Sequence, residues 1–332
     1  MYKVRAVSLS NFVEIAREVG IDPYEAFRRT GITQAMLEVP ENRIPAKLAI
    51  DLFEFASARS GCESFGLRMA ENRSAATLGP LSLLLERVAT VRDTVQVLID
   101  YQQHINNILT IAWEDRAGTP CIRFEMVPQC LQPQVVDHSV ALGFQAIRWA
   151  SGNQWSPLSV HLTRKAPADL SVFQRFYPCP VNFGSTFNGL RCTEASLGIG
   201  NPLADAAMAQ HMRQLLGLVK LEEGDEGIGE QVKRAITLLL PNGQATVANV
   251  AVHLGMSVRT LQRTLDGEGL SFAAVLNGMR RELTMRYLLS GDHSIAMVAE
   301  LIGYSSASSF NRWFNTEFGC APQKWRADAA GR

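Results

Sequence analysis

The sequence predicts an α+β N-terminal domain followed by an all-α, seven-helix domain that contains two helix-turn-helix units. Apolar residues first recur at helical spacing, then alternate as in strands, and from Ile228 onward recur only at helical spacing. A segment of the last hundred residues also repeats itself. We therefore expect one domain over 1–220, a Gly-rich acidic linker over 221–229 and a second domain over 230–328.

The charge and composition of the chain exclude few classes of protein. The chain has 332 residues, of which 47% are hydrophobic and 19% charged, with 32 Lys and Arg against 32 Asp and Glu. From Ile228 to the end, 11 Lys and Arg face 8 Asp and Glu, a mildly basic balance. The start of the chain has no apolar leader, and no apolar run reaches about 18 residues. We expect a cytoplasmic protein without a membrane segment.

The N-terminal domain mixes helical and strand patterns. Asp93 stands where a helix cap is expected, at the start of an amphipathic stretch. Two apolar runs separated by a turn-forming stretch predict a β-hairpin over 107–127. The helices are expected at 10–19, 46–60, 78–88, 93–105, 135–150 and 169–176, and further strands at 158–163, 180–183 and 190–193.

Seven helices are expected after the linker, at 228–239, 247–254, 258–267, 271–289, 295–302, 307–317 and 322–329. Within them, Ala251 and Gly255 recur 48 positions later as Ala299 and Gly303. With one extra residue in the turn, Leu261 and Leu265 correspond to the aromatic pair at 310 and 314. Such a repeat predicts two copies of one supersecondary unit.

Each repeated residue has a physical role in a helix-turn-helix. Thr246 and Ser294 stand where an N-cap accepts backbone N–H groups, and Ser257 and either Ser305 or Ser306 stand at the next cap. The two glycines supply the positive φ that ends the first helix of each unit. The large apolar residues four apart anchor the second helix, which is the one that enters the major groove of DNA.

The outward face of each second helix carries residues that can read bases. They are Arg259, Gln262 and Arg263 in the first unit, and Ala307, Ser308, Asn311 and Arg312 in the second. Arg pairs with guanine in a bidentate manner, as Gln and Asn do with adenine. A connecting helix of about 19 residues would be ~28 Å long, against ~34 Å for one turn of DNA. The two units could thus reach neighbouring major-groove segments of slightly bent DNA.

At these residues the sequence resembles the AraC/XylS family of bacterial regulators. The motifs are Gly255–Arg263, Arg281–Leu289, Ile302–Phe314 and Phe318–Arg326. The resemblance implies base contacts by Arg259, Gln262, Arg263, Ser308, Asn311 and Arg312, and phosphate contacts at the caps Thr246, Ser257, Ser294 and Ser306. Ala307 replaces the longer polar residue often found there, so the second unit is expected to read fewer bases through hydrogen bonds.

The N-terminal part resembles the arabinose-binding-type regulatory domain of the subgroup that includes ornithine-utilisation regulators. The strings that carry this resemblance are Thr30–Thr33, Arg43–Pro45, Gly66–Arg68, Leu78-Gly79 and Phe176–Gly184. It implies a small-molecule effector of unknown identity, a homodimer, and promoter DNA and RNA polymerase as partners. No residue identifies a sugar site, so effector-binding residues stay unknown. The amphipathic stretch 201–219 could form a dimer seam or pack within its own domain.

Other classes of protein have weaker support in the sequence. An enzyme with an N-terminal active site lacks a motif, because HExxH, GxSxG and a complete phosphate loop do not occur. The six cysteines are scattered without a CxxC pair, so we expect neither a metal nor a cofactor. A DNA-binding protein that responds to no ligand remains open, although the large apolar N-terminal domain favours a sensor. We expect no catalytic residues.

Overall fold

The computed structural model describes residues 2–116, 118–127, 130–218, 227–291 and 293–330. The chain divides into two compact units. The first comprises Met1–Leu162, Ala166–Phe183 and Asn188–Glu222, and the second Thr163–Lys165, Gly184–Phe187 and Glu223–Arg332. Most of the linker expected at 221–229 lies outside the described residues, and the boundaries at 220 and 230 stay a prediction.

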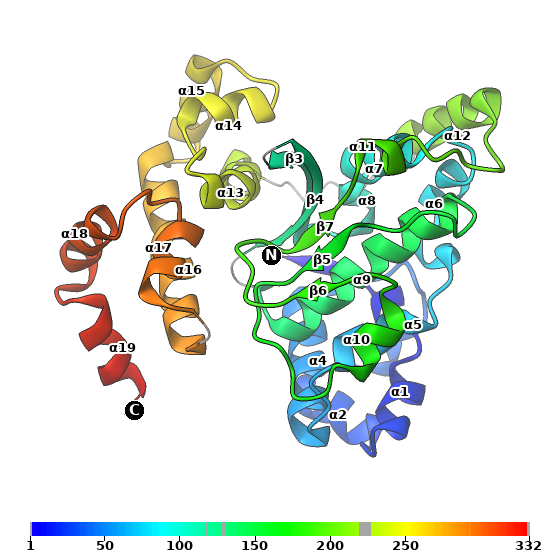
Figure 1. Cartoon of the computed structure of the whole chain (residues 1–332), viewed down its shortest axis with the longest axis horizontal. Helices are drawn as coiled ribbons and strands as arrows, with labels where there is room; N and C mark the ends of the chain where they lie inside the picture. Colours follow the sequence, from blue (N-terminus) through cyan, green and yellow to red (C-terminus); the bar gives the residue numbers. More distant parts are fainter. Residues whose placement is uncertain (1, 117, 128–129, 219–226, 292, 331–332) are drawn as a thin grey trace. The chain divides into compact units, whose positions relative to one another are not determined.

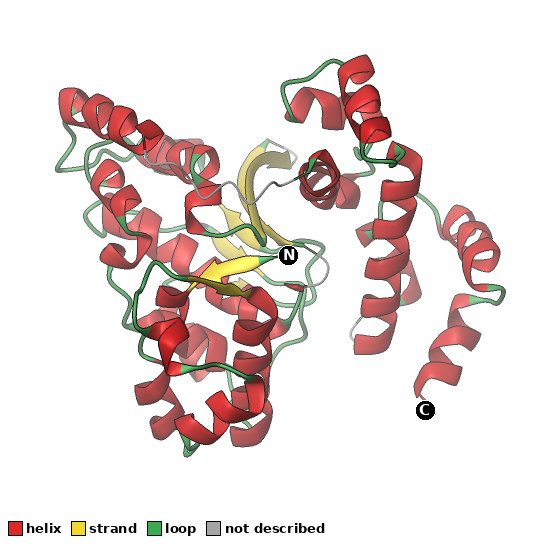
Figure 2. Cartoon of the chain, turned by 180° about the vertical axis from the view of Figure 1, so that it is seen from behind, coloured by secondary structure: helices red, strands yellow, loops and turns green. Residues whose placement is uncertain are grey.

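The first unit combines two sheets with helices, which confirms the α+β prediction (Figure 2). Strand β1 (Lys3–Arg5) pairs antiparallel with β2 (Arg43–Pro45). The larger sheet has the order β3-β4-β7-β5-β6, in which only the β5–β6 pair is parallel. Its strands are β3 (Leu109–Arg116), β4 (Thr119–Met126), β5 (Ser159–His161), β6 (Val181–Asn182) and β7 (Gly189–Arg191).

The helices of this unit lie below the larger sheet and to its right in the view of Figure 1. They are α1 (Phe12–Glu18), α2 (Pro23–Thr30), α3 (Gln34–Leu37), α4 (Ala46–Ser60), α5 (Phe65–Glu71), α6 (Pro80–Leu85), α7 (Val91–Asp100), α8 (Gln102–Ile105), α9 (Pro133–Ala150), α10 (Ser171–Phe176), α11 (Glu194–Leu197) and α12 (Ala206–Leu218). The described residues of this unit also include the 3-10 helices η1 (Ala6–Leu9) and η2 (Ala75–Leu78).

Helix α9 is the centre of the core. It packs against α4, α5 and α7, and against strand β4 of the larger sheet. Gly143 makes this close approach possible, because a Cβ at that position would overlap the ring of Phe124 on β4. Phe144 and Ile147 of the same helix are fully buried. Burial of this kind drives folding of the unit, since apolar area removed from water is its main stabilising contribution.

One helix differs from its prediction. The stretch expected as a single helix over 93–105 with Asp93 as its cap forms two helices, α7 and α8, that are separated at Tyr101. The N-cap is Thr90, whose side chain accepts a hydrogen bond from the backbone N–H of Asp93. The Asp93 carboxylate in turn accepts from the backbone N–H of Thr90 at 3.0 Å. Asp93 therefore belongs to a capping box one turn into the helix.

The second unit shows only helices and turns along 227–291 and 293–330 (Figure 2). The α-helices are α13 (Ile228–Leu239), α14 (Val247–His253), α15 (Val258–Gly267), α16 (Phe272–Ser290), α17 (Ile295–Leu301), α18 (Ala307–Phe318) and α19 (Pro322–Ala330). A 3-10 turn, η4 (Leu240–Asn242), follows α13. Helix α13 packs on α14, α15 and α16, while α16 also packs on α17 and α19. The seven-helix prediction is confirmed.

Candidate nucleic-acid interface

Helices α14 and α15 form the first helix-turn-helix unit. The Thr246 hydroxyl accepts from the Asn249 N–H at 3.2 Å and so caps α14. Gly255 has φ 66°, the left-handed conformation that ends this helix and opens the turn. The Ser257 hydroxyl accepts from the Thr260 N–H at 3.1 Å and starts α15. Both caps lie where the sequence predicts them.

Helices α17 and α18 repeat this construction. The Ser294 hydroxyl caps α17 by accepting from the Met297 N–H at 3.1 Å. The turn contains Gly303, with φ 80°. Of the two serines that could cap α18, the structure selects Ser306, which accepts from the Ser309 N–H at 3.3 Å. The four caps therefore fix where each helix begins, and each satisfies a backbone donor that the helix leaves unpaired.

The second helix of each unit is fixed by large apolar side chains. Leu261 and Leu265 of α15 are fully buried, as are Phe310 and Phe314 of α18. Phe310 and Phe314 contact each other, with ring centroids 5.6 Å apart. Residues four apart share one face of a helix, so burial of these pairs decides which face remains outside.

The face left outside carries the side chains that the sequence predicts to contact bases. All six are exposed: Arg259, Gln262, Arg263, Ser308, Asn311 and Arg312. The four cap residues Thr246, Ser257, Ser294 and Ser306 are exposed as well. Their contacts with bases and phosphates stay a prediction, which requires this exposure.

The arginines of these faces are free to meet an anion. Within the described part of the chain, Arg259, Arg263 and Arg312 form no ion pair with a carboxylate. A guanidinium with no internal partner keeps all five N–H donors for a phosphate or a guanine. The charge on this surface can therefore act on nucleic acid.

Several side chains that the sequence did not indicate attach the second helix-turn-helix unit to α16, the connector between the two helix-turn-helix units. Trp313 Nε1 of α18 donates to Asn277 Oδ1 of α16 at 2.7 Å, and Asn277 Nδ2 donates to Glu317 Oε1 at 2.8 Å. Arg280 of α16 lies 4.7 Å from the ring centre of Tyr304 and donates to the Ile302 carbonyl at 3.3 Å. These contacts set the position of α18 relative to the connector. No local sequence signal indicates them, because their partners are 22 to 40 residues apart.

In the first helix-turn-helix unit, Glu268 makes a similar contact between two helices. Its carboxylate accepts hydrogen bonds from the backbone N–H groups of Ile228 at 2.7 Å and Gly229 at 3.0 Å. A carboxylate is stabilising at a helix N-terminus because unpaired donors and the helix dipole point toward it. Glu268 lies directly after α15, so this contact attaches α15 to the first turn of α13.

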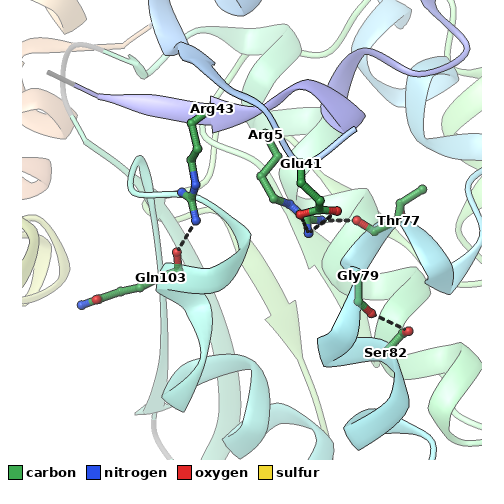
Figure 3. Close-up of polar contacts among 7 residues, drawn as sticks. All are labelled: Arg5, Glu41, Arg43, Thr77, Gly79, Ser82 and Gln103. Atoms are coloured by element: carbon green, nitrogen blue, oxygen red, sulfur yellow. Dashed lines mark hydrogen bonds and ion pairs between the residues drawn. The ribbon is translucent and has the colours of Figure 1, made fainter. Parts of the chain in front are cut away.

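In the N-terminal unit, Arg43 and Gly79, which belong to two of the strings that carry the family resemblance, both lie next to Arg5 (Figure 3). Arg5 donates to Glu41 Oε2 at 3.0 Å and to the Thr77 carbonyl oxygen, while Arg43 donates to the Gln103 carbonyl at 3.2 Å. Gly79 has φ 63° and ψ −143°, and a Cβ there would lie 2.8 Å from Arg5 Nη1. Only glycine adopts this conformation readily. These contacts hold the segment between α5 and α6 in place.

No group of three or more His, Cys, Asp or Glu side chains in the described ranges could hold a metal ion. None of the helices described is both long and apolar enough to cross a membrane.

Two family models match the chain. The arabinose-binding domain of AraC transcription regulators matches residues 20–199, and a helix-turn-helix domain matches residues 250–328. The first match alone covers more than half of the chain and contains η2, α9 and the larger sheet. The second contains both helix-turn-helix units except the start of α14.

Curated relatives agree with these matches. The chain is similar to the HTH-type transcriptional regulator VirS of Mycobacterium tuberculosis, with 26% identity over 98% of this chain and 96% of VirS. It is 20% identical to the ornithine utilization regulator of Pseudomonas aeruginosa, over 95% of this chain and 93% of that protein. The transcriptional activator NphR of Rhodococcus is 36% identical over 30% of each chain. With an arabinose-binding-type domain and two helix-turn-helix units, this chain belongs to the AraC family of DNA-binding transcription regulators.

Proposed function

We propose that this regulator binds promoter DNA in the cytoplasm as a homodimer and changes transcription in response to a small-molecule effector bound by its N-terminal unit. The observation that carries the DNA-binding part is the division of α15 and α18 into two faces. One face is fully buried through Leu261, Leu265, Phe310 and Phe314, and the other exposes the polar side chains predicted to read bases.

In this proposal, Arg259, Gln262 and Arg263 read one major-groove segment, and Ser308, Asn311 and Arg312 read the next. The hydroxyls at the caps Thr246, Ser257, Ser294 and Ser306 lie at helix N-termini, where backbone N–H groups attract phosphate. The connector α16 has 19 residues and is therefore about 28 Å long. That length is a little below one turn of DNA, so bound DNA should bend toward the protein.

Helix α12 supports the homodimer part of the proposal. Its inner face is buried through Ala209 and Leu216. Its outer face exposes Met208 by 43% and Leu215 by 44%, and Leu203, just before the helix, is exposed by 57%. Apolar side chains gathered on one exposed face are typical of an interface with another chain. Within the stretch 201–219, the inner face of α12 thus packs within its own unit, and the outer face is available for a dimer interface.

Regulation requires that the effector prefers one of two states. An effector that binds the DNA-competent and DNA-incompetent arrangements equally would shift nothing. We infer that the N-terminal unit binds the effector without converting it, and that a DNA-bound dimer acts on RNA polymerase at the promoter.

The test is DNA binding by variants of the exposed faces. Arg263→Ala and Arg312→Ala should each weaken specific binding by about 1–3 kcal/mol if these side chains read bases. Arg17→Ala, which removes an exposed arginine of α1 in the N-terminal unit, is the control and should bind as the wild type does. Unchanged affinity of both Arg263→Ala and Arg312→Ala would refute the proposed reading faces.

A further inference from the structure

The N-terminal unit contains a cavity bounded by η2, α9 and the end of α10. Its volume is about 440 Å³. Pockets that bind small organic molecules have volumes of about 300–1,000 Å³. A second cavity on the other side of Leu78, Leu142 and Ala146 has only about 80 Å³. The larger cavity falls within the range for small-molecule pockets and the smaller one lies below it, so the larger cavity is the one that suits an effector.

The walls of the larger cavity are held firmly. Helix α9, the centre of the core, supplies one wall. The opposite wall contains Thr77 and Leu78 of η2, which Arg5 holds through its hydrogen bond to the Thr77 carbonyl and its ion pair with Glu41 (Figure 3). The Arg5 side chain is itself only 6% exposed. The cavity is therefore built into the fold, and a ligand would meet a preformed site.

The lining carries an excess of positive charge. Three arginines, Arg73, Arg148 and Arg175, face one acidic residue, Glu71. The Glu71 carboxylate is already paired with Arg175, with Oε1 2.6 Å from Nη2. Two guanidinium groups thus remain without a carboxylate to balance them.

These two guanidinium groups differ in their surroundings. Arg73 donates to the carbonyl oxygens of Val7 at 2.7 Å, Met69 at 3.2 Å and Ser10 at 3.2 Å, which fixes its position without neutralising its charge. Burial lowers the pKa of Arg73 to about 10, so it stays protonated at neutral pH. Arg148 has no carboxylate partner among the described residues and rests 5.9 Å from the ring centre of Phe144. Its N–H donors are available to a ligand.

One side of the cavity is lined by apolar and aromatic side chains. Leu78, Leu142, Phe144, Trp149 and Phe176 contribute to it. A flat hydrocarbon body fits such a surface because aromatic faces stack and remove apolar area from water. A purely apolar ligand would leave the Arg148 guanidinium desolvated without a partner, which is costly. A cation would be repelled by the excess positive charge.

We propose that this cavity binds the effector, and that the effector is an organic anion with a ring-bearing apolar body whose anionic group pairs with Arg148. This proposal rests on the proposed function, because it names the effector site of the same regulator. The anionic group lies against the Arg148 guanidinium, with Arg73 adding a longer-range attraction. The ring system lies against Trp149 and Phe176.

The test uses the full chain and two fluorescent probes that share one ring system. 8-Anilinonaphthalene-1-sulfonate carries a negative charge, and N-phenyl-1-naphthylamine lacks it. The anionic probe should bind with one site per chain and at least about ten-fold more tightly than the neutral probe, as expected for a charge-assisted pair. Arg148→Gln should weaken binding of the anionic probe about ten-fold or more, and Arg148→Lys, which keeps the charge but not the planar set of donors, should lose less affinity than Arg148→Gln.

Arg17→Gln is the control, because it removes an exposed charge of α1 that does not line the cavity. It should leave the affinity for both probes unchanged. Equal affinity of Arg148→Gln and the wild type for the anionic probe would overturn the proposal, as would equal affinity of the wild type for the two probes. DNA binding by Arg148→Gln without probe should match the wild type. A wild type that binds no specific DNA would instead contradict the proposed function, whatever the probes do.

Discussion

Gly303, in the turn of the second helix-turn-helix unit, lies directly against the carbonyl oxygen of Leu240, which begins η4 after α13. A Cβ at position 303 would overlap that oxygen. At the corresponding Gly255 of the first unit, a Cβ would meet nothing within 4 Å. Two glycines that the sequence repeat treats as equivalent therefore have different surroundings.

Gly255→Ala should cost roughly 1–2 kcal/mol, the strain of a left-handed conformation on a residue with a Cβ. Gly303→Ala should cost a further 1–3 kcal/mol or so, because backbone must move to admit the methyl group. Hydrogen exchange followed by mass spectrometry measures the local opening free energy, on α14 and α15 for Gly255→Ala and on α17 and α18 for Gly303→Ala. Equal losses for the two substitutions would show that the contact with Leu240 does not restrain the second unit.

The difference between these glycines also shows where sequence reasoning ends. The turn at each position was predictable, because glycine and a cap residue mark it within a few residues. The contact with Leu240 joins residues 63 positions apart, and nothing local indicates it. The same holds for Glu268, Asn277 and Arg280, whose roles depend on distant partners.

In the N-terminal unit the prediction succeeded for long elements and missed short ones. Helices α4 and α9 and the hairpin β3–β4 follow clear periodicity. Strands β1 and β2 are three residues long and pair across about 40 positions, so neither gives a periodic signal. Helices α2, α3, α5 and α11 are also short and were not predicted. The cavity beside η2 lies between the predicted helix α9 and the segment 71–78, whose position depends on long-range contacts such as that of Arg5 with Thr77.

Glu268→Gln should weaken the attachment of α13 to α15. The amide can accept one of the two hydrogen bonds but lacks the charge that favours a helix N-terminus, so about 1 kcal/mol should be lost. Hydrogen exchange at the amides of Ile228 and Gly229 should quicken. Asp266→Asn, at an exposed position of the same helix end, is the matched control and should have little effect. No change in exchange with Glu268→Gln would contradict the role given to this carboxylate.

The cap residues allow stability and phosphate contact to be separated. Thr246→Ala and Ser294→Ala should each cost about 1 kcal/mol of stability, because an N-cap acceptor is lost. Thr246→Asp and Ser294→Asp keep an acceptor and suit the helix dipole, so stability should be preserved. If phosphate lies at these caps, the added negative charge should nevertheless weaken binding to any duplex, specific or not.

Fluorescence anisotropy with a mixed-sequence duplex, measured at several salt concentrations, reports this loss directly. The two Asp variants should bind more weakly than the wild type, most clearly at low salt. Affinities that match the wild type at every salt concentration would place the phosphates elsewhere.

Low pH should destabilise the N-terminal unit through His138. Burial, and then the nearby Arg73, lower the pKa of His138 from 6.5 to about 3, against a hydrogen bond between Nδ1 and the Gly66 carbonyl oxygen that acts the other way. Between those two pH values the unfolded chain binds a proton that the folded chain does not. Stability is therefore complete above about pH 6.5 and falls by about 1.4 kcal/mol per pH unit below it.

His138→Gln should flatten this dependence between pH 4 and 6.5, as judged from unfolding free energies followed by tryptophan fluorescence. His211→Gln, at an exposed position of α12, should leave the slope as in the wild type. Identical slopes for His138→Gln and the wild type would mean that other groups cause the acid sensitivity.

The first helix-turn-helix unit should contribute more to DNA sequence preference than the second helix-turn-helix unit. Arg259, Gln262 and Arg263 all carry long donors, whereas Ala307 and Ser308 begin α18 with short side chains. A selection of bound sequences from a random library should yield a sharper half-site for the first unit. Arg263→Ala should blur that half-site and leave the other unchanged. Two equally sharp half-sites would show that the second unit reads bases just as fully.

Genome-wide mapping of the sites bound by the full chain in its own cells tests the central claim most directly. We expect discrete bound sites that lie upstream of genes and share a two-part motif, with the parts about 10 base pairs apart. These sites should disappear when Arg263 and Arg312 are both replaced by Ala. Binding without discrete sites, or sites that survive the double substitution, would contradict the assignment of α15 and α18 as the helices that read promoter DNA.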